Sequence, residues 1–342
     1  MLRPMQVLTD QVLPALAGVF LAGSILWSAL AIYYWNRGAL VWRRWLAGGW
    51  AVFWLALMLG SHCNPIGLIA YGFAFGILLL AWLLIPARRD LIWESWHEHQ
   101  ARGEIEGDLL RIHDLRNFRW KSRTEAEPNW EVREYDLSTL RGMDFVTSSW
   151  GLRGVVHTLV SFQFGESDYL CLSIETRLER DEGQNPLAGL FKQYELVYLF
   201  TDERDALALR TNIRLEETRV YPTTLSPDKA RQLLTESVAD ANGLEERPRF
   251  YNTLWRNCLT SFMPRLGAHH KLSFDLRLIF NAGFDAYGIE RGLIDTDLPI
   301  DRAREVFAAD DHGRSSHDMG DYSRRIRPWR YEQTSPKPSQ PA

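Results

Sequence analysis

The sequence predicts an α+β protein in which three N-terminal transmembrane helices precede a domain with an antiparallel sheet and a cysteine-bearing helix. Two observations lead to this prediction. The first quarter of the 342-residue chain is apolar and nearly free of charge, whereas the remainder is dense in Arg, Asp and Glu. Beyond Gly103, apolar residues first alternate with polar ones, as in half-buried strands, and helix signals follow later.

The first predicted span covers residues 12–34, which contain no Asp, Glu, Lys or Arg. A helix rises about 1.5 Å per residue, so roughly 20 residues cross a hydrocarbon core of about 30 Å. A second uncharged run covers residues 45–87, and a turn at Ser61–Pro65 divides it. We therefore expect further spans at residues 45–60 and 66–86. A cleavable signal peptide fits less well, because the first apolar region is too long and no clear cleavage site follows.

These segments divide the chain into three parts. Residues 1–90 form the predicted membrane domain, and residues 104–308 form the second domain. Residues 310–342 consist largely of Asp, Arg, Ser, Gly and Pro without periodicity, which predicts a disordered tail.

A β-hairpin is the clearest feature of the second domain. Its two alternating strands cover residues 157–164 and 169–176. A three-residue loop that begins at Gly165 places His157 opposite Glu175, whereas a two-residue loop would place Thr176 there. Further strands are expected at residues 105–118, 130–137, 194–200 and 206–210.

Helix signals follow the strands. Ser226 and Pro227 are typical of a helix start, and Asn242-Gly243 of its end. A second helix is expected to begin at or near Asn257. The acidic cluster of residues 202–205 includes Arg204, which favours a solvated turn.

Composition argues against several classes of function. The formal net charge of −4 provides no basic field for nucleic acid. Three cysteines, one of them in the apolar quarter, do not make a disulfide framework. The histidine pairs 97/99 and 269/270 lack a recognised zinc spacing, and no phosphate loop or Gly-x-Ser-x-Gly motif is present. We therefore expect no metal, no cofactor and no nucleic-acid partner, and membrane lipids as partners.

Cys258 is the sharpest candidate for chemistry. At the start of a helix, its thiol would face unpaired N–H groups and the positive end of the helix dipole, which favour the thiolate. The same groups could stabilise the oxyanion that forms when a thiolate attacks a carbonyl. The alternative is a small buried hydrophobic residue, a role that Cys171 fits, since it alternates with apolar residues in a strand.

A thiol nucleophile needs a base and a group that orients the base. His157 opens a strand, from which its ring could project toward a helix packed on the sheet. Glu175 is the orienting candidate if the hairpin has the longer loop. Tyr251, Asn252 and Asn257 are candidates for substrate or oxyanion support.

A resemblance to a known family combines these features. The motifs that carry it lie in order between residues 104 and 305: Leu115-Arg116-Asn117-Phe118, Glu134-Tyr135-Asp136-Leu137, Ser149-Trp150-Gly151, His157 to Phe162, Ser173 to Arg177, Gln193 to Leu196, Asp202 to Asp205, Tyr251 to Leu254 and Asn257-Cys258. The chain resembles the Lnb N-terminal periplasmic domain family. The resemblance implies a circularly permuted papain-like, NlpC-type fold, with the histidine on a strand before the cysteine on a helix, as His157 and Cys258 are ordered here.

The resemblance also implies a function. A membrane-anchored cysteine acyltransferase of the cell envelope would work through a Cys258 thioester, with lipoproteins as acceptors. A peptidoglycan or peptide amidase with the same pair is the second hypothesis. A non-catalytic, membrane-tethered binding module is the third.

The side of the membrane on which the domain lies is contested. Arginines flank the predicted helices at positions 3, 37, 43, 44, 88 and 89, and with three spans all but the first fall on the side of the domain. The positive-inside rule then predicts a cytoplasmic domain. The resemblance implies a bacterial inner-membrane protein with a periplasmic domain, and that is our prediction, since arginine stems can reach the headgroups from either side.

Overall fold

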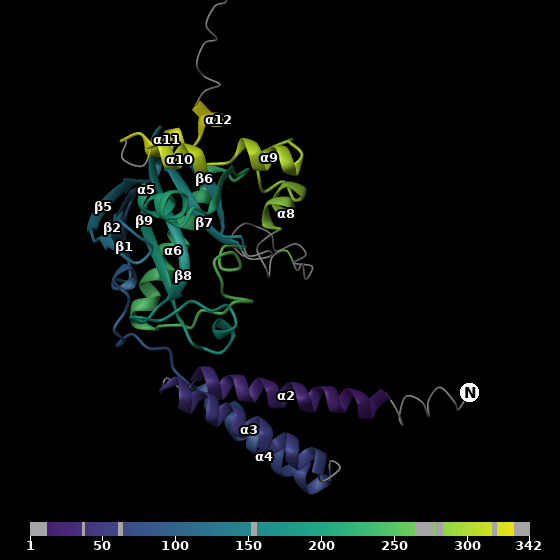
Figure 1. The fold of residues 1–342 in the computed structure, drawn as a ribbon. Helices are drawn as coiled ribbons and strands as arrows, with labels where there is room; N and C mark the ends of the chain where they lie inside the picture. The colour runs from purple at the N-terminus through teal and green to yellow at the C-terminus, as the bar shows by residue number, and fades with distance from the viewer. Residues whose placement is uncertain are drawn as a thin grey trace, which may run out of the picture. The chain divides into compact units, whose positions relative to one another are not determined.

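The computed structural model describes residues 12–35, 38–60, 64–151, 156–263, 277, 283–316 and 320–331. The chain divides into two units (Figure 1). The first is Met1–Ala87 with Asn185–Gln193, and the second is Arg88–Gln184 with Tyr194–Ala342.

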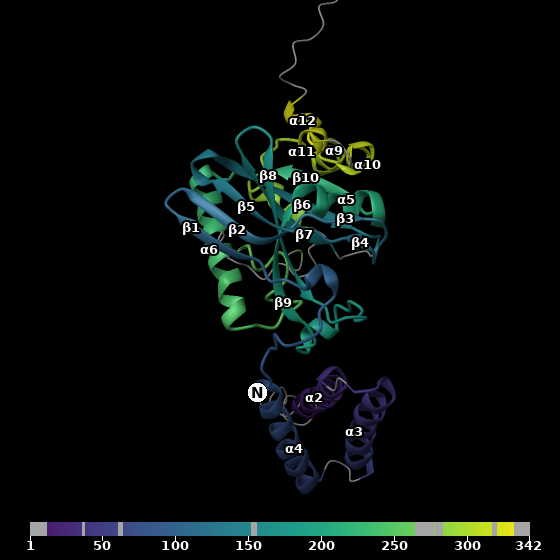
Figure 2. The same cartoon turned by 90° about the vertical axis from the view of Figure 1, so that its left-hand side faces the viewer.

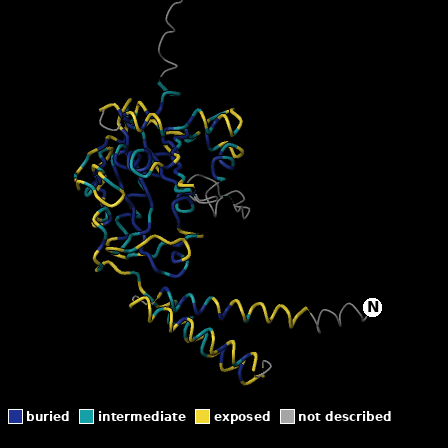
Figure 3. Tube along the Cα trace, in the orientation of Figure 1, coloured by how far each residue is buried: buried dark blue, intermediate teal, exposed yellow. Residues whose placement is uncertain are grey.

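The first unit consists of the helices α2 (Leu13–Trp35), α3 (Leu40–Gly60) and α4 (Pro65–Leu84), with η4 (Ala188–Leu190). Asn64 caps α4, and its side chain accepts a hydrogen bond from the N–H of Gly67 at 2.7 Å. The hydroxyl of Tyr71 donates to Ser24 Oγ at 2.9 Å and joins α4 to α2. Much of the helix surface is exposed (Figure 3). Many of the exposed side chains are large and apolar, as expected of helices that face lipid.

The prediction of three spans is wrong. Within the described residues, α2 and α4 are long and apolar enough to cross a membrane, whereas α3 is not. The reason lies where α3 begins. The helix starts at Leu40, before the uncharged run, and therefore includes Arg43 and Arg44. Charges within a helix oppose its insertion into the bilayer.

The second unit is built on one large sheet. Within the described residues, this sheet has eight strands, with the order β1-β2-β9-β8-β7-β6-β10 and β5 paired with β2. Their bounds are β1 (Arg102–Glu106), β2 (Leu109–Arg116), β5 (Trp130–Asp136), β6 (Leu140–Ser149), β7 (His157–Phe164), β8 (Asp168–Arg177), β9 (Glu195–Asp202) and β10 (Glu217–Pro222). The short strands β3 (Arg119–Trp120) and β4 (Ala126–Glu127) pair with each other.

Helices pack on both faces of this sheet (Figure 2). On one face, α6 (Pro227–Glu246) buries Leu233, Leu234 and Val238 in the main core. On the other face, α5 (Glu203–Ala208) packs Ala206 and Leu207 into a second, smaller cluster. Further short elements are η2 (Ser95–His97), η3 (Leu137–Thr139), η5 (Leu209–Arg214), α8 (Phe284–Glu290) and α9 (Ile300–Val306).

The predicted hairpin is confirmed, with the longer of the two loops. Phe164 pairs with Asp168 and Leu159 with Ser173, so the turn is Gly165–Ser167. Gly165 has a φ of 54°, a backbone conformation that glycine adopts readily. The predicted start of α6 is also confirmed, because the side chain of Ser226 caps the helix. The helix continues to Glu246, beyond the predicted end.

Two strand predictions differ from the structure. Residues 105–118 are not one strand, because Gly107, with a φ of 64°, turns the chain between β1 and β2. Residues 206–210 are helical. The side chain of Asp202 accepts a hydrogen bond from the N–H of Arg204 and caps α5, whose alanines favour a helix.

The predicted disordered tail is folded from Asp310 to Ser316 and from Gly320 to Tyr331. It forms α10 (Asp310–Ser316), α11 (Tyr322–Arg325) and α12 (Pro328–Tyr331), whereas residues 332–342 lie outside the described residues. The physical reason is a set of ion pairs with the sheet that a local pattern cannot reveal.

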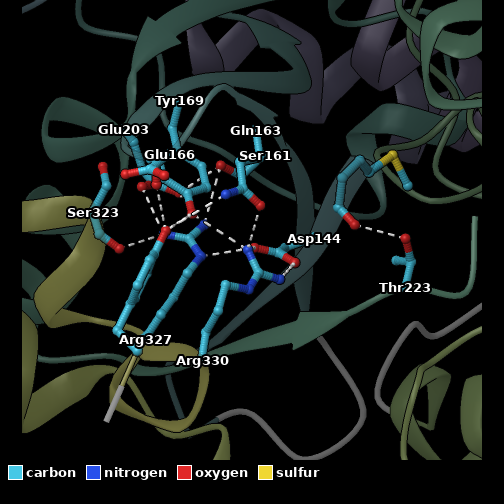
Figure 4. Close-up of polar contacts among 12 residues, drawn as sticks. Asp144, Ser161, Gln163, Glu166, Tyr169, Glu203, Thr223, Ser323, Arg327 and Arg330 are labelled. Atoms are coloured by element: carbon cyan, nitrogen blue, oxygen red, sulfur yellow. Dashed lines mark hydrogen bonds and ion pairs between the residues drawn. The ribbon is translucent and has the colours of Figure 1, made fainter. Parts of the chain in front are cut away.

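Arg327 is the centre of these ion pairs and is fully buried. Its Nε lies 2.7 Å from Asp144 and its Nη1 lies 2.9 Å from Glu203 (Figure 4). Arg330 also binds Asp144, so two arginines face two carboxylates. The prediction of a solvated turn at the acidic cluster is therefore wrong. Glu203 is buried in the core, and Arg327 neutralises its charge.

We predict that Arg327→Met lowers the free energy of unfolding by about 3–5 kcal/mol, because Glu203 then stays buried without its arginine and Asp144 keeps only Arg330. Unfolding of the full chain in detergent, followed by circular dichroism against denaturant, measures this change. Arg325→Met is the matched control, since its ion pair with Asp321 is about half exposed, at 49% for each side chain. An equal loss in both variants would contradict the assignment.

Candidate active site

Cys258 lies in a succession of turns that leads from Thr253 to Met263, rather than in the predicted α-helix. The turns are partly helical in their bonding, since the N–H of Ser261 donates to the carbonyl of Asn257 at 3.2 Å. Cys258 is 4% exposed.

Two asparagines hold this segment. Asn257 Oδ1 accepts hydrogen bonds from the N–H groups of Leu259 and Thr260, at 2.9 and 2.8 Å. Asn252 Oδ1 accepts from the N–H of Leu254 at 2.9 Å. Because these side-chain oxygens bind the backbone of their own turns, we assign both asparagines to positioning Cys258 rather than to contact with a substrate.

His157 lies beside Cys258, although a hundred residues separate them in the chain. The side chains of these two residues form a hydrogen bond, and the backbone of Thr158 forms another with the thiol. The His157 side chain is 17% exposed. The first residue of a strand thus lies against the turn that carries the cysteine, where the sequence predicted a helix.

Glu175 lies behind His157, and Ser173 connects the two. Nε2 of His157 is 2.8 Å from Ser173 Oγ, and this hydroxyl donates to Glu175 Oε1 at 2.6 Å. The direct distance from His157 Nε2 to Glu175 Oε1 is 3.5 Å. Residues 157, 173 and 175 share one face of the hairpin because the longer loop sets its register. Thr176 points to the opposite face.

Two further side chains hold the Glu175 carboxylate. Arg210, from η5, donates through Nη2 to Oε1 at 3.3 Å. His97, from η2, places Nε2 3.5 Å from Oε2. Sequence reasoning did not find Ser173, Arg210 or His97. Ser173 could have been found by the strand alternation, since it lies two residues before Glu175.

Tyr251 is the third candidate for oxyanion support, and it lies next to Cys258. Its hydroxyl interacts with the backbone of Cys258. Burial, followed by the nearby Cys258 and Glu175, raises the pKa of Tyr251 well above its usual value. The hydroxyl therefore keeps its proton and can donate a hydrogen bond to a developing negative charge.

The electrostatics of the site favour an ion pair between Cys258 and His157. Burial acts to raise the pKa of Cys258, but His157 and the Thr158 backbone outweigh it and lower the pKa. Burial acts to lower the pKa of His157, but Cys258 and Glu175 raise it to about 9. Despite burial, the nearby His157, His97 and Arg210 keep the pKa of Glu175 well below its usual value. These shifts favour the thiolate form of Cys258, the imidazolium form of His157 and the carboxylate form of Glu175.

The other cysteines differ from Cys258. Cys171 is fully buried in the second core cluster, and burial raises its pKa well above the usual value. Cys63 lies outside the described residues, as do His269 and His270. In the part of the chain that the structure describes, no group of three or more His, Cys, Asp or Glu side chains is arranged to hold a metal ion.

A buried cysteine with a histidine and a hydrogen-bonded carboxylate is the arrangement that proteins with a thiol nucleophile use. Residues 126–281 match the family of the Lnb N-terminal periplasmic domain. This match confirms the resemblance to that family over these residues, and it includes Cys258, His157 and Glu175. No curated protein and no solved structure matches the chain, so the papain-like fold stays a prediction. The family match and the two apolar helices together indicate a membrane-anchored protein with a periplasmic domain.

We predict that iodoacetamide modifies Cys258 faster than Cys171 at pH 7, because the pKa of Cys258 is lowered and that of Cys171 is raised, so Cys258 has the larger thiolate fraction. The rate should fall only as the pH drops below that lowered pKa. In His157→Gln, the onset of reactivity should move to higher pH, because only the Thr158 backbone then opposes the effect of burial on the thiol pKa. Peptide mapping by mass spectrometry distinguishes the three cysteines. Preferential modification of Cys171 would refute the site.

Proposed function

We propose that this protein is a membrane-anchored cysteine acyltransferase of the bacterial cell envelope that works through a thioester on Cys258. The observation that supports it most is the contact of Cys258 with His157, behind which Ser173 and Glu175 form a hydrogen-bonded pair. The order of His157 on a strand and Cys258 after it also fits the permuted papain-like fold that the resemblance implies.

The proposed reaction has two halves. The Cys258 thiolate attacks the carbonyl carbon of an ester or amide, and the carbonyl electron pair moves to oxygen. Tyr251 is positioned to donate a hydrogen bond to this oxyanion. When the oxyanion collapses, the carbon–oxygen or carbon–nitrogen bond breaks, and His157 gives its proton to the leaving group.

The second half transfers the acyl group from the thioester to an acceptor. An amine attacks the thioester carbon, His157 takes the amine proton, and the thiolate leaves as the new amide forms. The resemblance suggests the N-terminus of a lipoprotein as this amine. A membrane anchor favours such a substrate, since both partners are then confined to the bilayer surface. With water in place of the amine, the same residues would serve an amidase.

We predict that Cys258→Ala abolishes activity while the domain remains folded, and that His157→Gln lowers activity by about 10²–10⁴-fold. Glu175→Gln should impair activity without abolishing it, because an amide still accepts a hydrogen bond. Cys171→Ala should stay active but lose stability, because a buried side chain is removed. Acylation of lipoprotein N-termini, measured by mass spectrometry in cells with and without the gene, is the readout.

The outcomes of that experiment separate the three hypotheses. Loss of an acyl chain from lipoproteins in the Cys258→Ala strain supports the transferase. Unchanged lipoproteins with altered peptidoglycan fragments would favour the amidase. No change in either would favour a binding module.

The two candidate spans also bear on the side of the membrane. If α2 and α4 are the two crossings, arginines 37, 43 and 44 lie on one side, and arginines 3, 88 and 89 on the other with the domain. The charge count is then balanced and no longer opposes a periplasmic domain.

We predict that alkaline phosphatase fused after Trp93 is active, because the phosphatase folds only on the periplasmic side. Green fluorescent protein fused at the same residue should be dark. The reverse result would place the domain in the cytoplasm and would also remove the lipoprotein hypothesis.

A further inference from the structure

The segment that connects α4 to β1 is paired with the chain just beyond β8. The N–H of Glu94 donates to the carbonyl of Leu178 at 3.0 Å, and the N–H of Arg180 donates to the carbonyl of Ile92 at 2.8 Å. Trp93 and Glu179 form an antiparallel bridge. The connecting segment is therefore an ordered part of the second unit, and it lies next to the strand that carries Ser173 and Glu175.

Arg177 holds the same segment at its other end. Its Nε donates to the carbonyl of His97 at 2.9 Å and its Nη2 donates to that of Glu98 at 2.7 Å. The guanidinium also lies over the ring of Trp93, 4.4 Å from its centre. These contacts place His97 inside the protein, where it is 2% exposed.

The two ring nitrogens of His97 have different partners. The N–H of Leu178 donates to Nδ1 at 3.1 Å, so Nδ1 is an acceptor and the ring proton is on Nε2. Nε2 faces Oε2 of Glu175 at 3.5 Å. Within the described residues Nε2 has no hydrogen-bond partner, and Oε2 is the carboxylate oxygen that it approaches. Burial lowers the pKa of His97, so the ring is neutral and its Nε2 proton lies on the side of the carboxylate.

We propose that His97 is a positioning residue of the candidate active site, which orients the Glu175 carboxylate through Nε2–H and thereby supports His157. His97 acts on Oε2, while Ser173 and Arg210 bind Oε1. Oε1 is thus hydrogen-bonded by two side chains, and Oε2 faces the His97 ring. This inference extends the proposed function. His97 lies outside residues 126–281, so the family match does not include it.

The charges around the pair are few. Glu175 faces His157, His97 and Arg210, with Tyr251 near it. His97 faces Glu175, and the more distant charges of Arg116 and Arg177 disfavour its protonation. A change in the pH dependence of Cys258 alkylation can therefore be attributed to this small group of residues.

Two substitutions separate positioning from folding. His97→Gln keeps a donor near the place of Nε2 but loses the acceptor for Leu178. His97→Asn keeps an acceptor near the place of Nδ1 but loses the donor to Glu175. The rate of Cys258 alkylation against pH and the melting temperature are measured on the full chain in detergent, with iodoacetamide as the probe.

If His97 positions Glu175, His97→Asn should raise the pKa of Cys258 by about one unit, which slows alkylation by about 10-fold at pH values below the thiol pKa. His97→Gln should keep a profile close to the wild type even if it melts earlier. In a Glu175→Gln background, His97→Asn should add less than about a twofold further change, because both act through one carboxylate. His99→Asn is the control, since its side chain in the same segment is 45% exposed.

The opposite pattern, in which His97→Gln slows alkylation and His97→Asn does not, would assign His97 to folding of the segment and overturn the inference. Wild-type profiles in both variants would overturn it as well and leave the proposed function intact. A wild-type Cys258 that does not react at neutral pH would instead refute the proposed function itself, and the role of His97 with it.

Discussion

The pairing of β7 with β8 is the constraint on which the candidate site depends. Because side chains alternate along a strand, a slip of one residue would turn Ser173 and Glu175 to the opposite face of the sheet. The turn at Gly165 prevents this slip by pairing Phe164 with Asp168. His157 then lies within hydrogen-bond distance of Ser173. The turn that carries Cys258 has to contact only the first residue of β7.

The same face of the sheet carries two groups of buried carboxylates with different roles. Glu203 and Asp144 are neutralised by Arg327, whose side chain is entirely inaccessible. Glu175 is surrounded by a neutral histidine, an arginine and the His157 ring, and its side chain is 22% exposed. Buried charges that are fully paired and inaccessible to solvent contribute to structure. A carboxylate that lies next to a partly exposed imidazole can instead support chemistry.

The cysteine does not need the helix that the sequence suggested. Burial alone would keep the Cys258 thiol neutral, and in the described residues the opposing influences are the His157 ring and the Thr158 backbone. Asn252 and Asn257 fix the turns that bring the sulfur to these partners. Activation therefore follows from a contact between distant segments more than from local helix geometry.

Local signals in the sequence were sufficient for the apolar N-terminal segments, the hairpin with its two possible registers, the start of α6 and the choice of Cys258, His157 and Glu175 as candidates. Each depends on periodicity, turn chemistry or capping, which act over a few residues. Only the folded chain showed where α3 begins, that residues 206–210 are helical, and which of the two hairpin registers is adopted. The folding of residues 310–316 and 320–331 and the roles of His97, Arg210 and Arg327 also became visible only there. These features depend on charges and hydrogen bonds between segments that lie far apart in sequence, such as Arg327 with Asp144 and His97 with Glu175. Tertiary packing brings such partners together. The sequence near a charged residue does not indicate which distant residue it will pair with.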